Sequence, residues 1–175
     1  MTLKSRIAVS ICFIFLATGL KAQVPQSKTY SYPSDGFQVT FRAEPTQTKK
    51  NVDTQKGSFE LRIYWCGDSS VSYLVGVNDY GNAIAGQDPF TTLEGAKNGA
   101  MANTNSHLVK EQKIKLSVVP GIAFESENDQ THFTERIYLA GTTLYQVVVV
   151  YPIGNAPSDA ESFLESFGLI TRSSQ

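Results

Sequence analysis

The sequence contains few of the residues that build metal, disulfide or redox sites. It has two cysteines and two histidines in 175 residues. Neither His107 nor His132 belongs to a zinc-ligand spacing, and Cys-x-x-Cys pairs and alternating aspartate calcium loops are absent. Three acidic residues, Glu125, Glu127 and Asp129, alternate toward a predicted turn, but such a group at a hairpin end is usually solvated. The sequence therefore predicts no metal site and no cofactor.

The sequence patterns of nucleophilic and phosphate-transfer enzymes are also missing. There is no Gly-x-Ser-x-Gly motif and no glycine-rich phosphate loop. Glu135 and Arg136 are adjacent on a predicted strand, so their side chains point to opposite faces. Glu125 and Arg136 lie on neighbouring predicted strands and could form either a surface ion pair or a buried pair beneath a pocket. We predict no catalytic residues and expect a protein that is not an enzyme, and the ligand-binding residues stay unknown.

Long hydrophobic runs are absent except near the N-terminus. Residues 7–16 form an apolar run that follows two basic residues and is too short to span a bilayer. Leu20-Lys21-Ala22 then places a small residue before an expected cleavage site, which gives a mature start at Gln23. We predict that residues 1–22 are a signal peptide and that the protein is exported, either periplasmic or secreted. A retained anchor is the alternative, and after cleavage no transmembrane segment is expected.

A basic excess is also absent. The chain has 15 Lys+Arg and 16 Asp+Glu, and the predicted signal peptide contains Lys4, Arg6 and Lys21 but no acid. Its removal leaves 12 basic against 16 acidic residues, a formal charge of −4. A surface for nucleic acid would show the opposite balance, so we expect no nucleic-acid partner.

One cysteine would remain after cleavage, because Cys12 lies in the predicted signal peptide. No intrachain disulfide is then possible. The remaining chain of about 150 residues is long enough to bury a core as one domain without such a bond. Cys66 follows Trp65 in a strand-like run and is predicted to be a small buried hydrophobe, with an intermolecular disulfide as the open alternative.

Alternation of apolar and polar residues predicts two β-hairpins in the first half. The four predicted strands are residues 30–32, 37–41, 58–65 and 71–77. Turn-forming residues separate them at 33–36 and 67–69. Residues 23–29 are a polar lead-in. The polar segment 43–57 between the hairpins is expected to be a surface loop.

The middle of the chain predicts a helix followed by an edge strand. Asp88 suits the N-cap and Pro89 the first helical position, with an end near Asn105. Because the apolar helix residues are mostly small, we expect the helix to lie close on a sheet. The strand-like segment 107–116 carries three lysines, which favours an edge strand. The loop before the helix, 78–88, is long enough to be functional.

The last third predicts a three-stranded meander and a short helix. The strands are residues 122–127, 131–139 and 143–151, the first preceded by a chain break at Pro120-Gly121. The third is apolar on both faces, so it belongs in the middle of a sheet covered on both sides, and the two helices are the expected covers. Ser158 and Glu161 form a predicted capping box. One apolar stripe follows, made of Ala160, Phe163, Leu164 and Phe167. Residues 171–175 are a polar tail.

Several short features of residues 120–167 together carry a resemblance to a known family. They are Pro120-Gly121 before a strand with Phe124-Glu125, Arg136-Ile137-Tyr138-Leu139 before Gly141, Leu144-Tyr145-Gln146-Val147 and Ser166-Phe167 after Phe163. In this order and spacing they resemble the PsbP-like family, whose fold is shared with Mog-type Ran-binding proteins and many small exported bacterial proteins of unknown role.

The resemblance implies an α+β fold: an antiparallel β-sheet flanked by helices on both faces, a PsbP-like α/β/α sandwich, as a single domain over residues 30–170. Members as a rule bind or assemble other proteins and are not enzymes, but their roles differ widely. We therefore expect an exported, non-catalytic binding or accessory module that engages a protein or a cell-envelope component. The alternative is a small-ligand-binding or hydrolytic protein with a pocket near the 78–88 loop.

Overall fold

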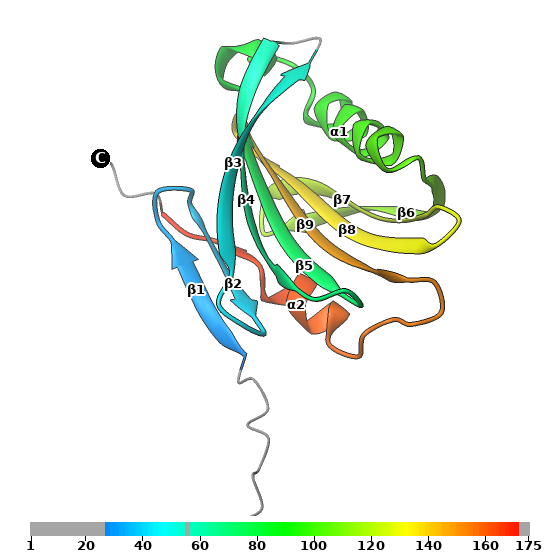
Figure 1. The fold of residues 1–175 in the computed structure, drawn as a ribbon. Coiled ribbons are helices and arrows are strands. Elements are labelled where there is room, and N and C mark those ends of the chain that lie inside the picture. Colours follow the sequence, from blue (N-terminus) through cyan, green and yellow to red (C-terminus); the bar gives the residue numbers. More distant parts are fainter. Residues whose placement is uncertain (1–26, 55–56, 172–175) are drawn as a thin grey trace, which may run out of the picture.

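The computed structural model describes residues 27–54 and 57–171 (Figure 1). The strands are β1 (Lys28–Tyr32), β2 (Phe37–Phe41), β3 (Thr46–Thr54), β4 (Gly57–Gly67), β5 (Ser72–Asp79), β6 (His107–Leu116), β7 (Val119–Glu127), β8 (Thr131–Ala140), β9 (Thr143–Pro152) and β10 (Gly168–Leu169). The helices are the 3₁₀ helix η1 (Gly81–Ile84), α1 (Pro89–Thr104) and α2 (Ala160–Ser166). The predicted signal peptide, residues 1–22, lies outside the described residues.

Seven strands form one antiparallel sheet in the order β3-β4-β5-β9-β8-β7-β6. β9 lies in the middle, between β5 and β8, as its two apolar faces predict. The lysine-bearing β6 is an edge strand, which confirms that prediction. The two predicted hairpins and the β7-β8-β9 meander are confirmed as well.

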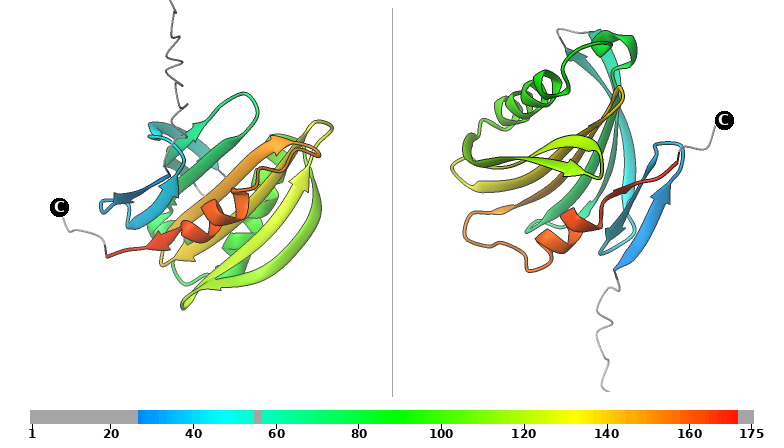
Figure 2. Two further views of the ribbon diagram at one scale, coloured as in Figure 1. Left: turned by 90° about the horizontal axis from the view of Figure 1, so that it is seen from below. Right: turned by 180° about the vertical axis from the view of Figure 1, so that it is seen from behind.

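The two faces of this sheet have different covers (Figure 2). On one face α1 packs on β7 and β8, where Leu93 joins Phe124 and Ile137 in a buried cluster. On the other face a small sheet, β1-β2-β10, and the short helix α2 pack on β9 and its neighbours. The predicted antiparallel sheet is confirmed. The prediction that helices cover both faces is incomplete, because the small sheet β1-β2-β10 covers much of the second face beside α2.

The polar segment 43–57 is not a loop, since β3 occupies most of it. β3 pairs along its whole length with β4, from Thr46 opposite Trp65 to Thr54 opposite Gly57. It is an edge strand with mostly exposed side chains, so backbone pairing holds it with little apolar burial. The hydrophobic pattern that detects strands is therefore missing from its sequence. The lead-in is also shorter than predicted, because β1 begins at Lys28.

Pro120-Gly121 does not break the chain but lies inside β7. The turn before it is made at Ser117, whose φ is 56°. Gly121 is needed for a different reason, which is the close approach of β7 to β8. A Cβ at this position would lie 2.5 Å from the carbonyl oxygen of Ile137 and 2.6 Å from the ring of Tyr138.

The two helix starts differ in how well they were predicted. Asp88 caps α1 by accepting a hydrogen bond from the backbone N–H of Thr91 at 3.0 Å, and Pro89 is the first helical residue. The capping box of α2 is wrong: Asp159 precedes that helix and its side chain makes no capping bond. Tertiary contacts use these side chains instead, because Asp159 accepts from the Tyr73 hydroxyl and Glu161 pairs with Arg136.

A buried polar contact fixes the small sheet to the large one. Asp35, in the turn between β1 and β2, accepts a hydrogen bond from the Tyr64 hydroxyl, and its carboxylate lies 2.6 Å from Nε of Arg62. The hydroxyl of Tyr145 donates to the carbonyl of Asp35 at 2.7 Å. Burial and the bond to Asp35 raise the pKa of Tyr64, so its phenol stays protonated and able to donate.

Cys66, the one cysteine among the described residues, is buried and free. Burial raises the pKa of its thiol, as expected for a small core residue. Its neighbours on β4 show the limit of the alternation pattern. Phe59, Leu61, Ile63 and Trp65 do share a face, but the better-buried side chains, Tyr64 and Cys66, are on the other.

Across the described part of the chain, no helix is both long and apolar enough to cross a membrane.

Candidate functional site

A groove of about 840 Å³ lies between α1 and the face of the sheet beside it. Its wall is one side of α1, and its floor comes from β3, β4, β5 and β9 (Figure 1). Leu61, Asn78, Leu144 and Gln146 contribute to the floor. These residues share a face, because Leu61 is opposite Asn78 and Asn78 is opposite Leu144 in the strand register.

The position of α1 leaves this groove open. Lys97 of α1 is buried and pairs with Glu94 at 2.6 Å and with Glu111 of β6. Burial alone would lower the pKa of Lys97, but the hydrogen bonds to the two carboxylates raise it, so it stays charged. Lys113 of β6 also lies 4.3 Å from the ring centre of Phe90. These contacts hold α1 over the β6 side of the sheet and away from β3, β4 and β5.

The wall of the groove is a stripe of small side chains along α1. It contains Gly95, Ala96, Gly99 and Ala100, between Thr92 and Asn103. A Cβ added to Gly95 or Gly99 would meet no atom within 4 Å, so open space lies beside both. The small residues were expected to bring the helix close to the sheet, and Ala96 and Ala100 do pack against the buried cluster that contains Leu93. The same two residues border the groove, together with Gly95 and Gly99.

Two buried polar atoms of the groove have no hydrogen-bond partner among the described residues. They are Oγ1 of Thr92 and Oδ1 of Asn78, in side chains that are 5% and 7% exposed. Burial raises the pKa of the adjacent Tyr80, and a hydrogen bond with the Asn78 side chain partly offsets this. Most buried polar atoms in folded proteins are paired. Both side chains border the groove, so a ligand there can bond to these atoms once the side chains turn toward it.

The groove is nearly uncharged. Lys50 is the one charged side chain among the described residues that line it. Its neighbour Lys49 pairs with Glu60 at 3.3 Å on the opposite face of β3. The groove therefore combines an apolar floor, amide and hydroxyl groups, and a single ammonium.

The sequence predicted part of this site. The alternative hypothesis placed a pocket near the 78–88 loop, and Asn78 and Tyr80 from its start do line the groove. The rest of the site comes from elements that the sequence did not connect to that loop. The sequence pattern predicts Gln146 only as part of a core strand and predicts no role for Thr92, since nothing local shows which side of a helix will face a groove.

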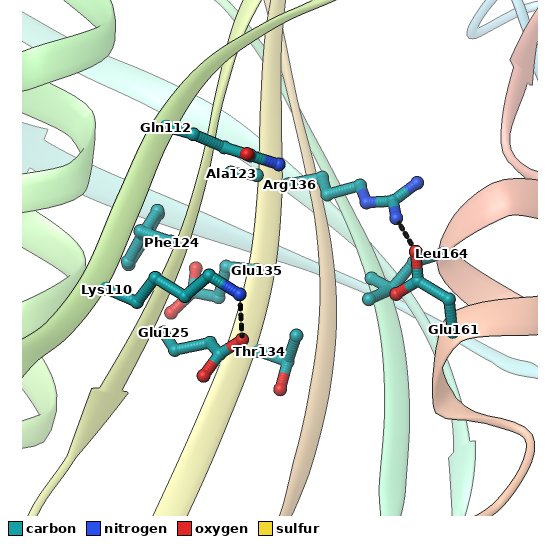
Figure 3. Close-up of a pocket in the computed structure, with 10 residues that line it drawn as sticks. All are labelled: Lys110, Gln112, Ala123, Phe124, Glu125, Thr134, Glu135, Arg136, Glu161 and Leu164. Carbon is teal, nitrogen blue, oxygen red and sulfur yellow. Dashed lines mark hydrogen bonds and ion pairs between the residues drawn. The ribbon is translucent and has the colours of Figure 1, made fainter.

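A second, smaller depression of about 120 Å³ lies on the opposite face of the sheet (Figure 3). Glu125 and Arg136 both line it, as the sequence suggested, but they do not pair with each other. Lys110 lies 3.7 Å from Glu125, and Arg136 pairs with Glu161 of α2. These four charges are paired. Glu135 also borders the depression, but strand alternation directs its side chain to the other face of the sheet. The volume is below the roughly 300 Å³ at which ligand pockets begin. We therefore regard this depression as a surface ion-pair cluster.

The three acids that alternate toward the β7-β8 turn do not come together as a site. Glu127 lies 2.7 Å from Nδ1 of His132, whose ring stacks on Tyr151, and Glu125 contacts Lys110. Within residues 27–54 and 57–171, no group of three or more His, Cys, Asp or Glu side chains is arranged to hold a metal ion.

Glu135 is a buried carboxyl group on the α1 side of the sheet. It is 5% exposed and is opposite Phe124 and Val148 in the register, while Arg136 points to the other face as predicted. No hydrogen bond or ion pair of this carboxyl is found among the described residues. Burial raises its pKa to about 7.

Comparison with known proteins agrees with the architecture. No family model matches the chain, and neither does any curated protein. The solution structure of cyanobacterial PsbP (CyanoP) from Synechocystis sp. PCC 6803 is similar, with a TM-score of 0.58 over 88% of this chain and 98% of that one. The chain has a PsbP-like fold.

The likeness extends to the PsbP-like fold and no further, because the two chains are 8% identical. Two weaker structural matches have TM-scores below 0.5. A protein of unknown function from Pseudomonas aeruginosa, described as a putative regulator, is 9% identical with a TM-score of 0.42, over 67% of this chain and 92% of that one. A protein from Bacteroides thetaiotaomicron VPI-5482 is 15% identical with a TM-score of 0.41, over 82% and 48%.

Replacing Thr92 by valine should stabilise the ligand-free protein. The substitution keeps the shape and removes a buried hydroxyl without a partner, so we expect the free energy of unfolding to rise by about 1 kcal/mol. Urea denaturation measures this. Thr91→Val is the control, because the Thr91 hydroxyl is exposed and contacts Asp88, and it should bring no gain. Equal effects of the two changes would contradict the assignment of Thr92.

Replacing Glu135 by glutamine should change how stability depends on pH. The folded pKa of about 7 is above the ordinary glutamate pKa of 4.5, so the folded state binds a proton more tightly than the unfolded state. Stability is then lost as the pH rises from about 4.5 through 7. Glu135→Gln should remove this loss and stabilise the protein by about 3 kcal/mol at pH 8, with little effect at pH 4.

Urea denaturation between pH 4 and 8 measures the effect of Glu135→Gln. The exposed Glu165 of α2 supplies a matched control, and Glu165→Gln should leave the curve of the parent protein unchanged. Parallel curves for Glu135→Gln and the parent protein would show that Glu135 is not the group responsible.

Proposed function

We propose that this protein is an exported, non-catalytic binding module that holds its ligand in the groove between α1 and the seven-stranded sheet. The observation that carries the proposal is a pair of buried atoms beside the groove, Oγ1 of Thr92 and Oδ1 of Asn78, for which the described part of the chain supplies no hydrogen-bond partner. Leaving such atoms unsatisfied costs about 1–3 kcal/mol each. A ligand in the groove would recover that cost if the two side chains turn toward it, and this favours an occupied groove.

Recognition suits the groove better than catalysis. Its described titratable side chains are Lys50, which is exposed, and Tyr80, whose pKa burial raises. General acid–base catalysis needs a positioned group whose pKa is near the working pH. Glu135 has such a pKa, but it does not line this groove. The ligand-binding form of the alternative hypothesis is therefore favoured over the hydrolytic form.

The groove also supplies a place for the partner expected from the family resemblance. A protein or a cell-envelope component with an exposed hydrogen-bonding segment could enter it from the solvent. The groove volume of about 840 Å³ falls in the range of roughly 300–1,000 Å³ that is usual for ligand sites. The same site thus serves a small molecule or a segment of a larger partner.

Export rests on the apolar run at residues 7–16 and the small residue before Gln23. We expect N-terminal sequencing of the protein from the envelope or medium of its own cells to begin at Gln23. A chain found in the cytoplasm with residues 1–22 intact would contradict this part of the proposal.

Binding in the groove can be tested with a photo-crosslinking amino acid placed at Asn103. Asn103 lines the groove and is exposed, while Ala102 is exposed on the same helix outside it. In cells of the source organism, position 103 should give a discrete adduct and position 102 none. Gly99→Phe should abolish the adduct by filling the groove. Equal adducts from both positions, or none from 103, would overturn the proposal.

A further inference from the structure

We propose that the groove binds an extended peptide segment that is neutral or acidic. This inference rests on the proposed function and names the class of ligand. It follows from the length of the groove, the arrangement of its hydrogen-bonding groups, the low wall formed by α1, and the charge of its lining.

The groove has the length of a short peptide strand. Its wall runs from Thr92 to Asn103, three turns of α1. At 1.5 Å of rise per residue this is about 16 Å. An extended chain advances about 3.3 Å per residue, so the wall matches about five residues of an extended peptide.

Both the wall and the floor of the groove carry polar side chains. Thr92 and Asn103 come from the wall, and Asn78 and Gln146 come from the floor. Oδ1 of Asn78 can act only as an acceptor, while the Thr92 hydroxyl can donate or accept. A peptide backbone presents both N–H and C=O groups and can satisfy both atoms. An acyl chain has neither and would leave the two atoms buried and unpaired.

Because the helix side of the groove lacks large side chains, a peptide backbone can approach α1 closely. Gly95 and Gly99 have no side chain, and the space beside them is open. Each glycine in a helix lowers the stability by about 1 kcal/mol relative to alanine, so Gly95 and Gly99 destabilise α1. The half-buried Val52 and Leu61 offer apolar surface to the side chains of the ligand.

The aromatic lining favours a peptide over a sugar. Tyr80 is the one aromatic residue among the described lining, and the Phe59 ring meets it in an edge-to-face contact at 5.1 Å and 77°. A sugar ring is usually held against the open face of an aromatic ring, and a single residue at one end of the groove offers little such surface.

The charge of the lining sets the charge of the peptide. Lys50 is the one charged side chain among the described lining residues. An acidic side chain or a terminal carboxylate would be complementary to it, whereas a basic peptide would meet a like charge and no carboxylate. We therefore expect acidic and neutral sequences to bind and basic ones to be excluded.

The test is selection of peptides from a phage-displayed random dodecapeptide library on the exported protein. Three variants are compared with the parent protein. Gly99→Phe fills the groove, Ala102→Phe adds the same ring outside it, and Thr92→Val removes the unpaired hydroxyl. Synthetic forms of the enriched peptides are then titrated by fluorescence anisotropy.

We expect enriched peptides to be neutral or acidic and to bind the parent and Ala102→Phe equally. Gly99→Phe should weaken binding at least tenfold. Thr92→Val should weaken it several-fold although that protein is no less stable, and introducing lysines into a peptide should weaken it about tenfold. No enrichment over blank wells, or enriched peptides that bind Gly99→Phe as well as the parent, would overturn the inference.

Two further probes distinguish a failure of the peptide inference from a failure of the proposed binding function. Decanoate and chitotetraose are titrated against the parent protein and Gly99→Phe by calorimetry, which needs no bound peptide. If either binds in a groove-dependent manner and peptides do not, the binding function stands and the peptide assignment falls. If crosslinking from Asn103 also yields nothing, the proposed function itself has failed.

Discussion

The burial of β9 on both faces is the constraint on which the rest of the structure depends. β9 lies between β5 and β8, so its backbone groups are paired on both sides and its side chains need cover above and below. Val147 and Val149 are fully buried beneath the small sheet and α2, while Leu144 joins the cluster under α1. Neither cover could be removed without exposing a central apolar strand.

The two covers are unequal, and the groove is the consequence. Val148 and Val150, on the α1 side of β9, remain half-buried. Leu93 and the Lys97–Glu111 pair hold α1 over β6, β7 and β8, so it does not extend across β3, β4 and β5. A sheet of seven strands is too wide for one helix to cover. The groove lies along the uncovered part. Asn78 and Thr92 border it, and one buried atom of each has no hydrogen-bond partner among the described residues.

Much of the fold was predictable because its signals are local. The Asp88 cap, the hairpins and the lysine-bearing edge strand each depend on a few neighbouring residues. β3 was missed because an edge strand can be polar, and the two-residue β10 because it exists through its pairing with β2. The capping box of α2 failed because Glu161 forms an ion pair with Arg136 from a distant strand.

The sequence by itself determined where the chain is extended, where α1 begins and which strand is central, since alternation and capping act between near neighbours. The tertiary structure alone decided the candidate site. Thr92, Asn78 and Gln146 come from α1, β5 and β9, and they meet because strand register sets which face each strand residue occupies. The rotation of α1, set by its contacts to β6, β7 and β8, then turns Thr92 and the two glycines toward that face.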